Sequence, residues 1–167
     1  MAFLVDFEIE RTFEAACPRD RVFDVLADVP RSVSHFPKVD QLVEIGEGKY
    51  RWEMEKIGLD RYHIQTIYAC KYVSDREKGT VKWTPVKGEG NAEVSGKWTL
   101  KALDEKNTRI TLQTKGAMTV PLPSLVKLVL APIVRAEFTR LVDQYLKNLV
   151  VTFEKEAARK KRGRSAT

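Results

Sequence analysis

Few side chains in this sequence could carry acid–base or metal chemistry. Two histidines, His35 and His63, and two cysteines, Cys17 and Cys70, are the candidates. A zinc site needs three or four clustered ligands, and these four residues have no spacing typical of one. The HExxH, GxSxG and paired CxxC motifs and the glycine-rich phosphate loops do not occur. The sequence therefore predicts no metal site, no cofactor and no catalytic motif.

Two polar residues lie where they could meet a ligand. His35 precedes Phe36 in an apolar loop, where it could bind a ligand headgroup, act as a base or remain a half-exposed loop residue. Arg11 shares the parity of the apolar residues in an alternating segment, so we expect it to point inward. A buried charge needs a partner. Three alternatives are therefore open for Arg11. Its side chain contacts a ligand anion, forms an ion pair with Glu137 or Asp143, or is turned outward by a β-bulge.

The first segments predict one strand and two short helices. Residues 3–15 alternate apolar and polar side chains, which is typical of a strand with one face in water. Pro18 favours the first turn of a helix that ends near Asp28, because Pro30 disfavours helical backbone at the residue before it. Residues 30–36 then predict a second short helix or a turn.

Six further strands are predicted between these helices and the C-terminal region. Short polar or glycine-containing connections separate them, including residues 87–91, which predict a flexible loop. Short connections favour an antiparallel meander, and no strand–helix–strand rhythm indicates a parallel sheet. The predicted strands are 39–45, 50–57, 62–73, 80–86, 92–102 and 108–118.

Residues 123–157 predict one long amphipathic helix. Apolar side chains recur at spacings of three and four, which places them on one stripe; they are Val126, Leu130, Val134, Phe138, Leu141, Tyr145, Leu149 and Phe153. Pro132 leaves two alternatives open: residues 124–131 form a separate apolar segment at a cavity mouth, or the helix starts late.

A helix with one apolar face must be covered, and the predicted sheet is the only partner available. A curved sheet around one helix can enclose a cavity, and small residues expected to face inward would leave room in it: Ala92, Gly96, Ala102, Thr114 and Gly116. The aromatic side chains could be plain core or pocket lining, and tyrosine hydroxyls inside would orient a polar ligand group. The predicted ligand-binding residues are Phe7, Arg11, His35, Phe36, Trp52, Tyr68, Trp83, Trp98, Met118, Leu130, Val134 and Phe138.

The net charge of +6 is concentrated at the C-terminus. Residues 157–167 hold five basic residues and no acid, so residues 1–156 carry about +1. A nearly neutral domain argues against nucleic acid as a partner. The basic segment predicts either a frayed, solvated end or a contact with anionic lipid or RNA. We expect one domain over 1–157 and a disordered basic tail over 158–167.

The sequence contains no apolar run of membrane-spanning length and no signal peptide at its start, which predicts a cytoplasmic protein. Two cysteines are too few for a disulfide framework, which agrees with a reducing compartment.

The sequence resembles the START-like superfamily, also called SRPBCC, which includes polyketide cyclases, dehydrases and lipid-transport domains. The resemblance rests on residues 13–26, 28–37 and 95–100 and on the proline-opened C-terminal helix, and it covers nearly all of residues 3–157. It implies an α+β helix-grip fold: about seven antiparallel strands in a curved sheet around a long C-terminal helix, with two short helices after the first strand.

Within this superfamily the sequence is most similar to the branch of coenzyme Q-binding proteins and carbon monoxide dehydrogenase G-subunit-like proteins. The spacing of Asp28, Pro30, Phe36 and Pro37 carries that likeness. The resemblance implies binding or transport of a hydrophobic small molecule: a lipid, a quinone or isoprenoid, or a polyketide-like ring. The alternatives are a cyclase or dehydratase enzyme and a ribosome- or protein-binding module. The sequence makes no prediction about oligomeric state.

Overall fold

The computed structural model describes residues 2–59 and 62–165, with the backbone alone for 57–59, 62–63 and 160–165. Nine strands and three α-helices follow one another along this part of the chain. In order they are β1 (Phe3–Ala15), α1 (Arg19–Ala27), α2 (Val29–Val33), β2 (Val39–Gly46), β3 (Lys49–Met54), β4 (Ile57–Leu59), β5 (Tyr62–Ile64), β6 (Ile67–Asp75), β7 (Thr80–Gly90), β8 (Ala92–Ala102), β9 (Thr108–Val120), the 3₁₀ turn η1 (Ser124–Val126) and α3 (Lys127–Ser165).

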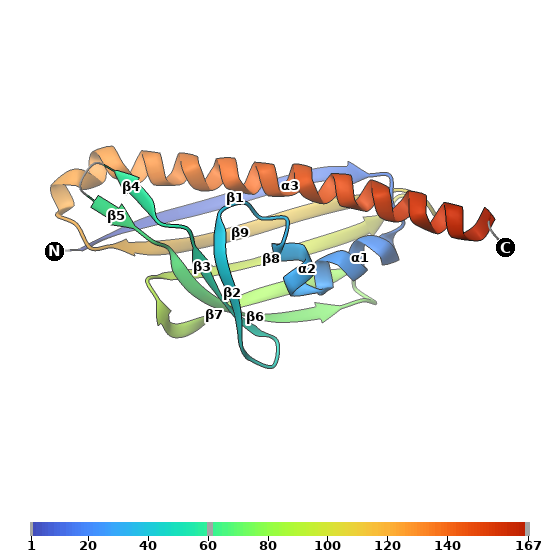
Figure 1. Ribbon diagram of the computed structural model, residues 1–167, viewed down its shortest axis with the longest axis horizontal. Helices are drawn as coiled ribbons and strands as arrows, with labels where there is room; N and C mark the ends of the chain where they lie inside the picture. The colour runs from blue at the N-terminus through green and yellow to red at the C-terminus, as the bar shows by residue number, and fades with distance from the viewer. Residues whose placement is uncertain (1, 60–61, 166–167) are drawn as a thin grey trace.

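Seven strands form one antiparallel sheet in the order β1-β9-β8-β7-β6-β3-β2. The α3 helix runs the length of this sheet, with β4 and β5 beside its first turns and α1 and α2 beside its later half (Figure 1). The first and last strands pair over their whole length, from Phe3 opposite Val120 to Ala15 opposite Thr108. The predicted helix-grip fold and its seven-stranded sheet are confirmed.

The packing of α3 against the sheet differs between its two halves. Leu149 and Phe153, in the later half, have no exposed surface. At the start of the helix region Leu125 and Leu128 are 90% and 88% exposed. Buried core residues occur in both halves of α3, from Leu130 to Phe153, but the start of the helix also leaves large apolar side chains in water.

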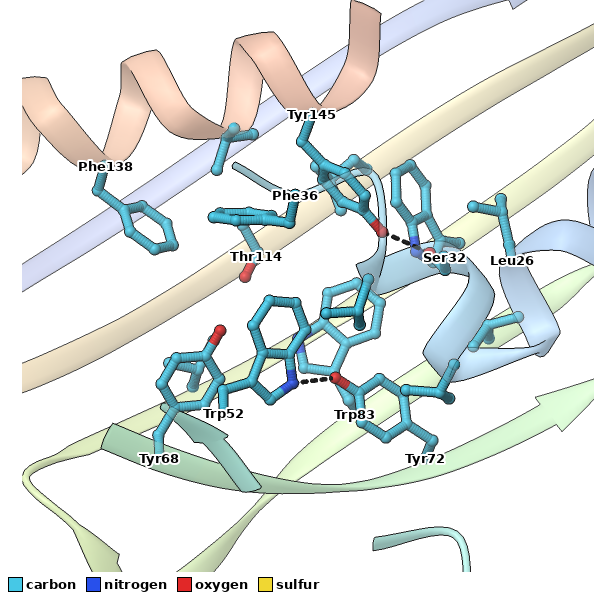
Figure 2. Close-up of a pocket in the computed structure, with 17 residues that line it drawn as sticks. Leu26, Ser32, Phe36, Trp52, Tyr68, Tyr72, Trp83, Thr114, Phe138 and Tyr145 are labelled. Carbon is cyan, nitrogen blue, oxygen red and sulfur yellow. Dashed lines mark hydrogen bonds between the residues drawn. The ribbon is translucent and has the colours of Figure 1, made fainter. Parts of the chain in front are cut away.

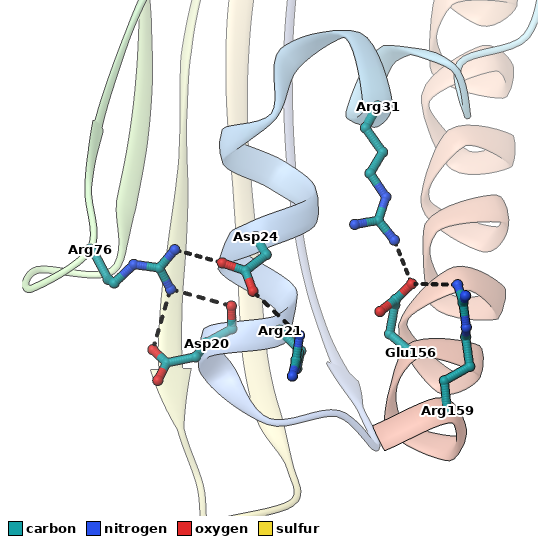
Figure 3. Close-up of polar contacts among 7 residues, drawn as sticks. All are labelled: Asp20, Arg21, Asp24, Arg31, Arg76, Glu156 and Arg159. Atoms are coloured by element: carbon teal, nitrogen blue, oxygen red, sulfur yellow. Dashed lines mark hydrogen bonds and ion pairs between the residues drawn. The ribbon is translucent and has the colours of Figure 1, made fainter. Parts of the chain in front are cut away.

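Ion pairs hold the short helices in place (Figure 3). Arg76, in the turn after β6, lies 2.5 Å from the Asp24 carboxylate of α1. Arg31 of α2 reaches Glu156 of α3 at 2.5 Å. Asp28 accepts a hydrogen bond from the Arg31 backbone N–H and so caps α2. These contacts fix α2 over the later half of α3.

The region around residues 54–67 differs from the sequence prediction. The strand expected over 62–73 is two strands, β5 and β6, and the strand expected over 50–57 ends at Met54. Asn91 explains the break, because its side chain accepts from the Ile67 backbone N–H and donates to the Gln65 carbonyl. The short β4–β5 pair then forms a sheet of its own. Side-chain hydrogen bonds across distant segments leave no periodic signal in the sequence.

The expected flexible loop over 87–91 is mostly strand. The β7 strand continues to Gly90, which lies opposite Tyr68. Gly90 has a φ of +79°, and an added Cβ would lie 2.1 Å from the Ile67 carbonyl oxygen. Only glycine fits this position.

The α3 helix passes through Pro132 without interruption. Pro132 is the sixth residue of the helix, so it removes only the hydrogen bond to the Leu128 carbonyl. Residues on both sides of Pro132 belong to one helix, so neither predicted alternative, a separate segment over 124–131 or a helix that starts late, describes α3. The backbone of α3 extends to Ser165, and the division into a domain and a disordered tail stays a prediction.

Replacing Phe153 with alanine should reduce the free energy of unfolding by about 3–5 kcal/mol, because it leaves a cavity in the core beneath α3. Val151, on the same helix, is 51% exposed. Val151→Ala should therefore change the free energy of unfolding by less than about 0.5 kcal/mol. Urea unfolding followed by circular dichroism measures both. Equal effects of the two substitutions would contradict the assigned packing of α3.

Candidate functional site

In the described part of the chain, two hollows with a mainly apolar lining lie between the sheet and α3. We call the first the inner cavity; it has a volume of about 50 Å³ beneath the middle of α3. For comparison, an apolar cavity of roughly 150 Å³ holds one benzene molecule. The second, which we call the outer groove, has a volume of about 470 Å³ beneath the first half of α3.

Aromatic side chains fill most of the space around the inner cavity (Figure 2). Trp52 stacks on Tyr68 with ring centroids 5.4 Å apart, and Phe36 meets the Trp52 ring edge-on at 5.4 Å. Trp98 packs against Tyr145 from the other side at 6.0 Å. These rings come from β3, β6, β8, α3 and the segment after α2, so no single element forms the site.

The inward-facing glycines do not leave empty space, contrary to expectation. A Cβ added at Gly96 would lie 2.3 Å from the Trp83 ring, and one added at Gly116 would lie 2.8 Å from the Phe7 ring. Each glycine lies opposite the aromatic residue on the neighbouring strand. These two glycines therefore admit a large ring from the adjacent strand, which reduces the space inside. Ala102, also expected to face inward, is exposed instead.

The polar side-chain atoms among the described lining residues of the inner cavity are hydroxyls and indole nitrogens. Trp52 Nε1 donates to the Tyr72 hydroxyl at 2.8 Å, and the Ser32 and Tyr145 hydroxyls share a hydrogen bond. The Tyr68 hydroxyl makes no hydrogen bond to any residue that the structure describes. Tyr68 is only 4% exposed, and its hydroxyl points into the cavity (Figure 2).

Burial raises the pKa of Tyr68 well above its usual value, so the hydroxyl stays protonated at neutral pH and can donate a hydrogen bond. The described lining of the inner cavity contains no Asp, Glu, His, Lys or Arg side chain. The cavity therefore suits an uncharged group that accepts a hydrogen bond.

The outer groove is apolar within and charged at its rim. Met54, Ile64, Met118, Val134 and Leu141 contribute apolar surface from β3, β5, β9 and α3. Methionine side chains are flexible and adapt to ligands of different shape. The volume falls in the usual range of small-molecule sites, about 300–1,000 Å³.

The charged rim is centred on Glu137. Its carboxylate accepts hydrogen bonds from Arg140 at 2.6 Å and from Lys38 at 3.1 Å. The Arg140 hydrogen bond, followed by that of Lys38, lowers the pKa of Glu137 to about 2. Glu137 is thus ionised at neutral pH and links α3 to the segment before β2.

A family model described as polyketide cyclase / dehydrase and lipid transport matches residues 6–154. The chain belongs to this family. The resemblance to the START-like superfamily is therefore confirmed. Membership of the branch of coenzyme Q-binding proteins and carbon monoxide dehydrogenase G-subunit-like proteins stays a prediction. No curated protein matches the sequence.

Solved structures similar to this polyketide cyclase / dehydrase and lipid transport family member share its fold at low sequence identity. An aromatase/cyclase from a Streptomyces species is 19% identical, with a TM-score of 0.61 over 93% of this chain and 95% of that one. A START superfamily protein from Mycobacterium smegmatis is 12% identical, with a TM-score of 0.62 over 89% and 97%. A norcoclaurine synthase from Thalictrum flavum, solved with a transition-state analogue, is 17% identical, with a TM-score of 0.55 over 90% and 98%. At these identities the likeness shows the fold alone.

Most of the predicted ligand-binding residues of this family member gather around the two hollows. Leu130 is buried in the core, and Phe7 packs against Phe138 with ring centroids 4.2 Å apart. Met118 and Val134 line the outer groove. Those that line the inner cavity are Phe36, Trp52, Tyr68, Trp83, Trp98 and Phe138. Their contact with a ligand stays a prediction.

Arg11 and His35 lie outside the described lining of both hollows. Arg11 forms an ion pair with Asp143 at 2.9 Å, one of the partners expected for it, and both side chains are about 40% exposed. His35 Nε2 lies 2.6 Å from the Thr152 hydroxyl, and Nδ1 lies 2.8 Å from the Arg31 carbonyl. Both residues thus join other elements to α3 rather than facing the cavity.

The predicted ligand-binding residues do not include Ser32, Tyr72 or Tyr145, although all three line the inner cavity; of these, only Tyr145 is among the aromatic residues considered as core or pocket lining. Tyr145 belongs to the apolar stripe of α3, and Tyr72 has the parity of Tyr68, so a signal existed for both. Ser32, in a five-residue helix, carried no signal. Its position follows from the contacts of α2 with α3.

The described residues contain no group of three His, Cys, Asp or Glu side chains placed to hold a metal ion. Within the same residues, no helix is both long enough and apolar enough to cross a membrane.

Replacing Glu137 with glutamine should lower stability at neutral pH, because it removes a carboxylate that Arg140 and Lys38 stabilise. The folded pKa of about 2 lies below the ordinary 4.5, so this contribution is complete above pH 4.5 and is lost as the pH falls toward 2. Urea unfolding of both proteins between pH 7 and pH 3 should show a difference that shrinks below pH 4.5. Glu154→Gln, at an exposed position of α3, is the control. A difference that is constant with pH would contradict the assigned role of Glu137.

Proposed function

We propose that this protein binds or carries an uncharged hydrophobic small molecule between its sheet and α3. The observation that supports this most is the apolar outer groove of about 470 Å³. It lies next to a cavity into which the hydroxyl of a buried residue, Tyr68, points without a described hydrogen-bond partner. The apolar part of the ligand would lie in the groove, and burial of its surface would supply affinity at roughly 25 cal/mol per Å². Suitable ligands are a lipid, a quinone or isoprenoid, or a polyketide-like ring.

Catalysis by a cyclase or dehydratase mechanism is the second candidate, since the similar solved structures include an aromatase/cyclase. Acid–base chemistry needs a group whose pKa lies near the working pH. The described polar groups of the inner cavity are mainly tyrosine, serine and threonine hydroxyls, and burial raises the pKa of Tyr68, Tyr72 and Tyr145. This composition favours binding over proton transfer.

A short-chain ubiquinone with two isoprene units should bind and quench tryptophan fluorescence in a saturable way. All three tryptophans of the protein line the inner cavity, so they report directly on this site. Tyr68→Phe should weaken quinone binding about three- to tenfold, the usual effect of one hydrogen bond. It should leave binding of farnesene, an isoprenoid hydrocarbon without a carbonyl group, unchanged.

Tyr50→Phe, outside the described lining of both hollows, is the matched control for Tyr68→Phe. Native mass spectrometry of protein purified from its host should also show a bound apolar molecule. Protein that is always empty and binds neither quinone nor farnesene would overturn the proposed function.

We also propose that the basic C-terminus contacts anionic membrane surfaces. The α3 helix has 39 residues, about 58 Å at 1.5 Å per residue, and the groove lies under its first half. The five basic residues from Arg159 to Arg164 therefore belong to the end of α3 away from the groove, so this contact would leave the groove mouth open.

Truncation after Ala157 should reduce binding to vesicles that contain 30% phosphatidylserine by at least about tenfold, since each basic residue near such a surface contributes about 1 kcal/mol. Vesicle sedimentation at 0.1 M salt measures this, and uncharged phosphatidylcholine vesicles are the control. Equal binding of the full chain and the truncated chain would exclude the tail as the contact. Loss of ribosome co-sedimentation with no effect on vesicles would favour the ribosome-binding alternative instead.

A further inference from the structure

The inner cavity and the outer groove meet at one side chain. Along α3, Val134 and Leu141 face the groove, while Val142 and Tyr145 face the cavity. Phe138 is the only described residue that lines both hollows. Its ring is therefore the partition between them.

The surroundings of the Phe138 ring are uneven. It packs against Phe7, with ring centroids 4.2 Å apart, and against Phe36 at 6.4 Å. It also lines the open groove. A phenylalanine packed on all sides cannot change rotamer without displacing its neighbours, whereas Phe138 has free volume in one direction.

We propose that Phe138 is a gate that swings into the groove and lets the head of a ligand reach Tyr68. The inference rests on the proposed binding function. When Phe138 turns about its χ1 angle to another staggered rotamer, its ring leaves a space of its own size beside the inner cavity. Closed, the cavity of about 50 Å³ is too small for any ring. Open, it has room for one.

The vacated space specifies the class of ligand. A planar six-membered ring would replace the Phe138 ring against Phe7 and Phe36 and keep the aromatic contacts that Phe138 gives up. An acceptor such as a carbonyl on that ring would meet the Tyr68 hydroxyl. An apolar tail would remain in the groove. The structure therefore favours a ring-headed, uncharged molecule with a carbonyl group and an apolar tail over a simple acyl chain.

Two measurements on Phe138→Ala test the gate. In stopped-flow fluorescence, the association rate of the two-isoprene ubiquinone should rise about tenfold, because binding no longer waits for the ring to move. In ligand-free protein, quenching of tryptophan by acrylamide should increase about twofold, since all three tryptophans line the cavity that the gate closes. Phe138→Trp should slow quinone association, and association of farnesene should change little in either variant.

Val134→Ala is the matched control, because Val134 lines the outer groove but not the inner cavity. Its truncation should not alter acrylamide quenching. Phe138→Leu keeps the apolar bulk without the ring, and it replaces Phe138→Ala if urea unfolding shows that the alanine variant is not folded. A folded Phe138 variant in which quinone association and acrylamide quenching both equal those of the wild type would overturn the gate. The acrylamide measurement needs no ligand. If the quinone does not bind at all, the proposed function fails while acrylamide quenching still tests the gate.

Discussion

The structure depends on the burial of one apolar helix face against one concave sheet, and that burial is uneven. The later half of α3 is closed by Leu149 and Phe153, and α2 is tied to it through the Arg31–Glu156 ion pair. The first half covers an open groove and leaves Leu128 in water, as the preceding η1 turn does Leu125. The well-packed later half of α3 supplies stability. The loosely packed first half can therefore open locally at lower cost, as a ligand-binding region must.

The same sheet shows why the interior holds less empty space than its small residues indicate. Where a glycine lies opposite an aromatic residue, the aromatic ring covers the glycine, as Trp83 does at Gly96 and Phe7 does at Gly116. The interior becomes an aromatic shell with few polar atoms, which excludes charge and leaves a buried phenol as a hydrogen-bond donor. If Phe138 acts as the proposed gate, access to that donor depends on one ring of α3, and binding and selectivity would depend on the same contact.

Much of the candidate site could be predicted because its residues follow regular periods. Phe36, Trp52, Tyr68, Trp83, Trp98 and Phe138 were expected around a cavity, and they line it. The apolar neighbours of Arg11 and His35 make both candidates for ligand contact. In the structure each polar side chain has a partner on α3: Asp143 for Arg11 and Thr152 for His35. Strand parity gives the direction of a Cβ atom but not the path of a flexible side chain beyond it.

The sequence by itself determined the order of the elements, the antiparallel meander, the amphipathic stripe of α3 and the family, because each depends on local spacing or on the succession of segments. Only the tertiary structure decided that β5 and β6 are separate, that α3 continues through Pro132, and that the interior is divided at Phe138. The reason is physical: these features depend on side chains such as Asn91 and Phe138 meeting partners from distant segments. The periodicity of apolar residues along the sequence does not show where free volume lies beside a ring such as that of Phe138.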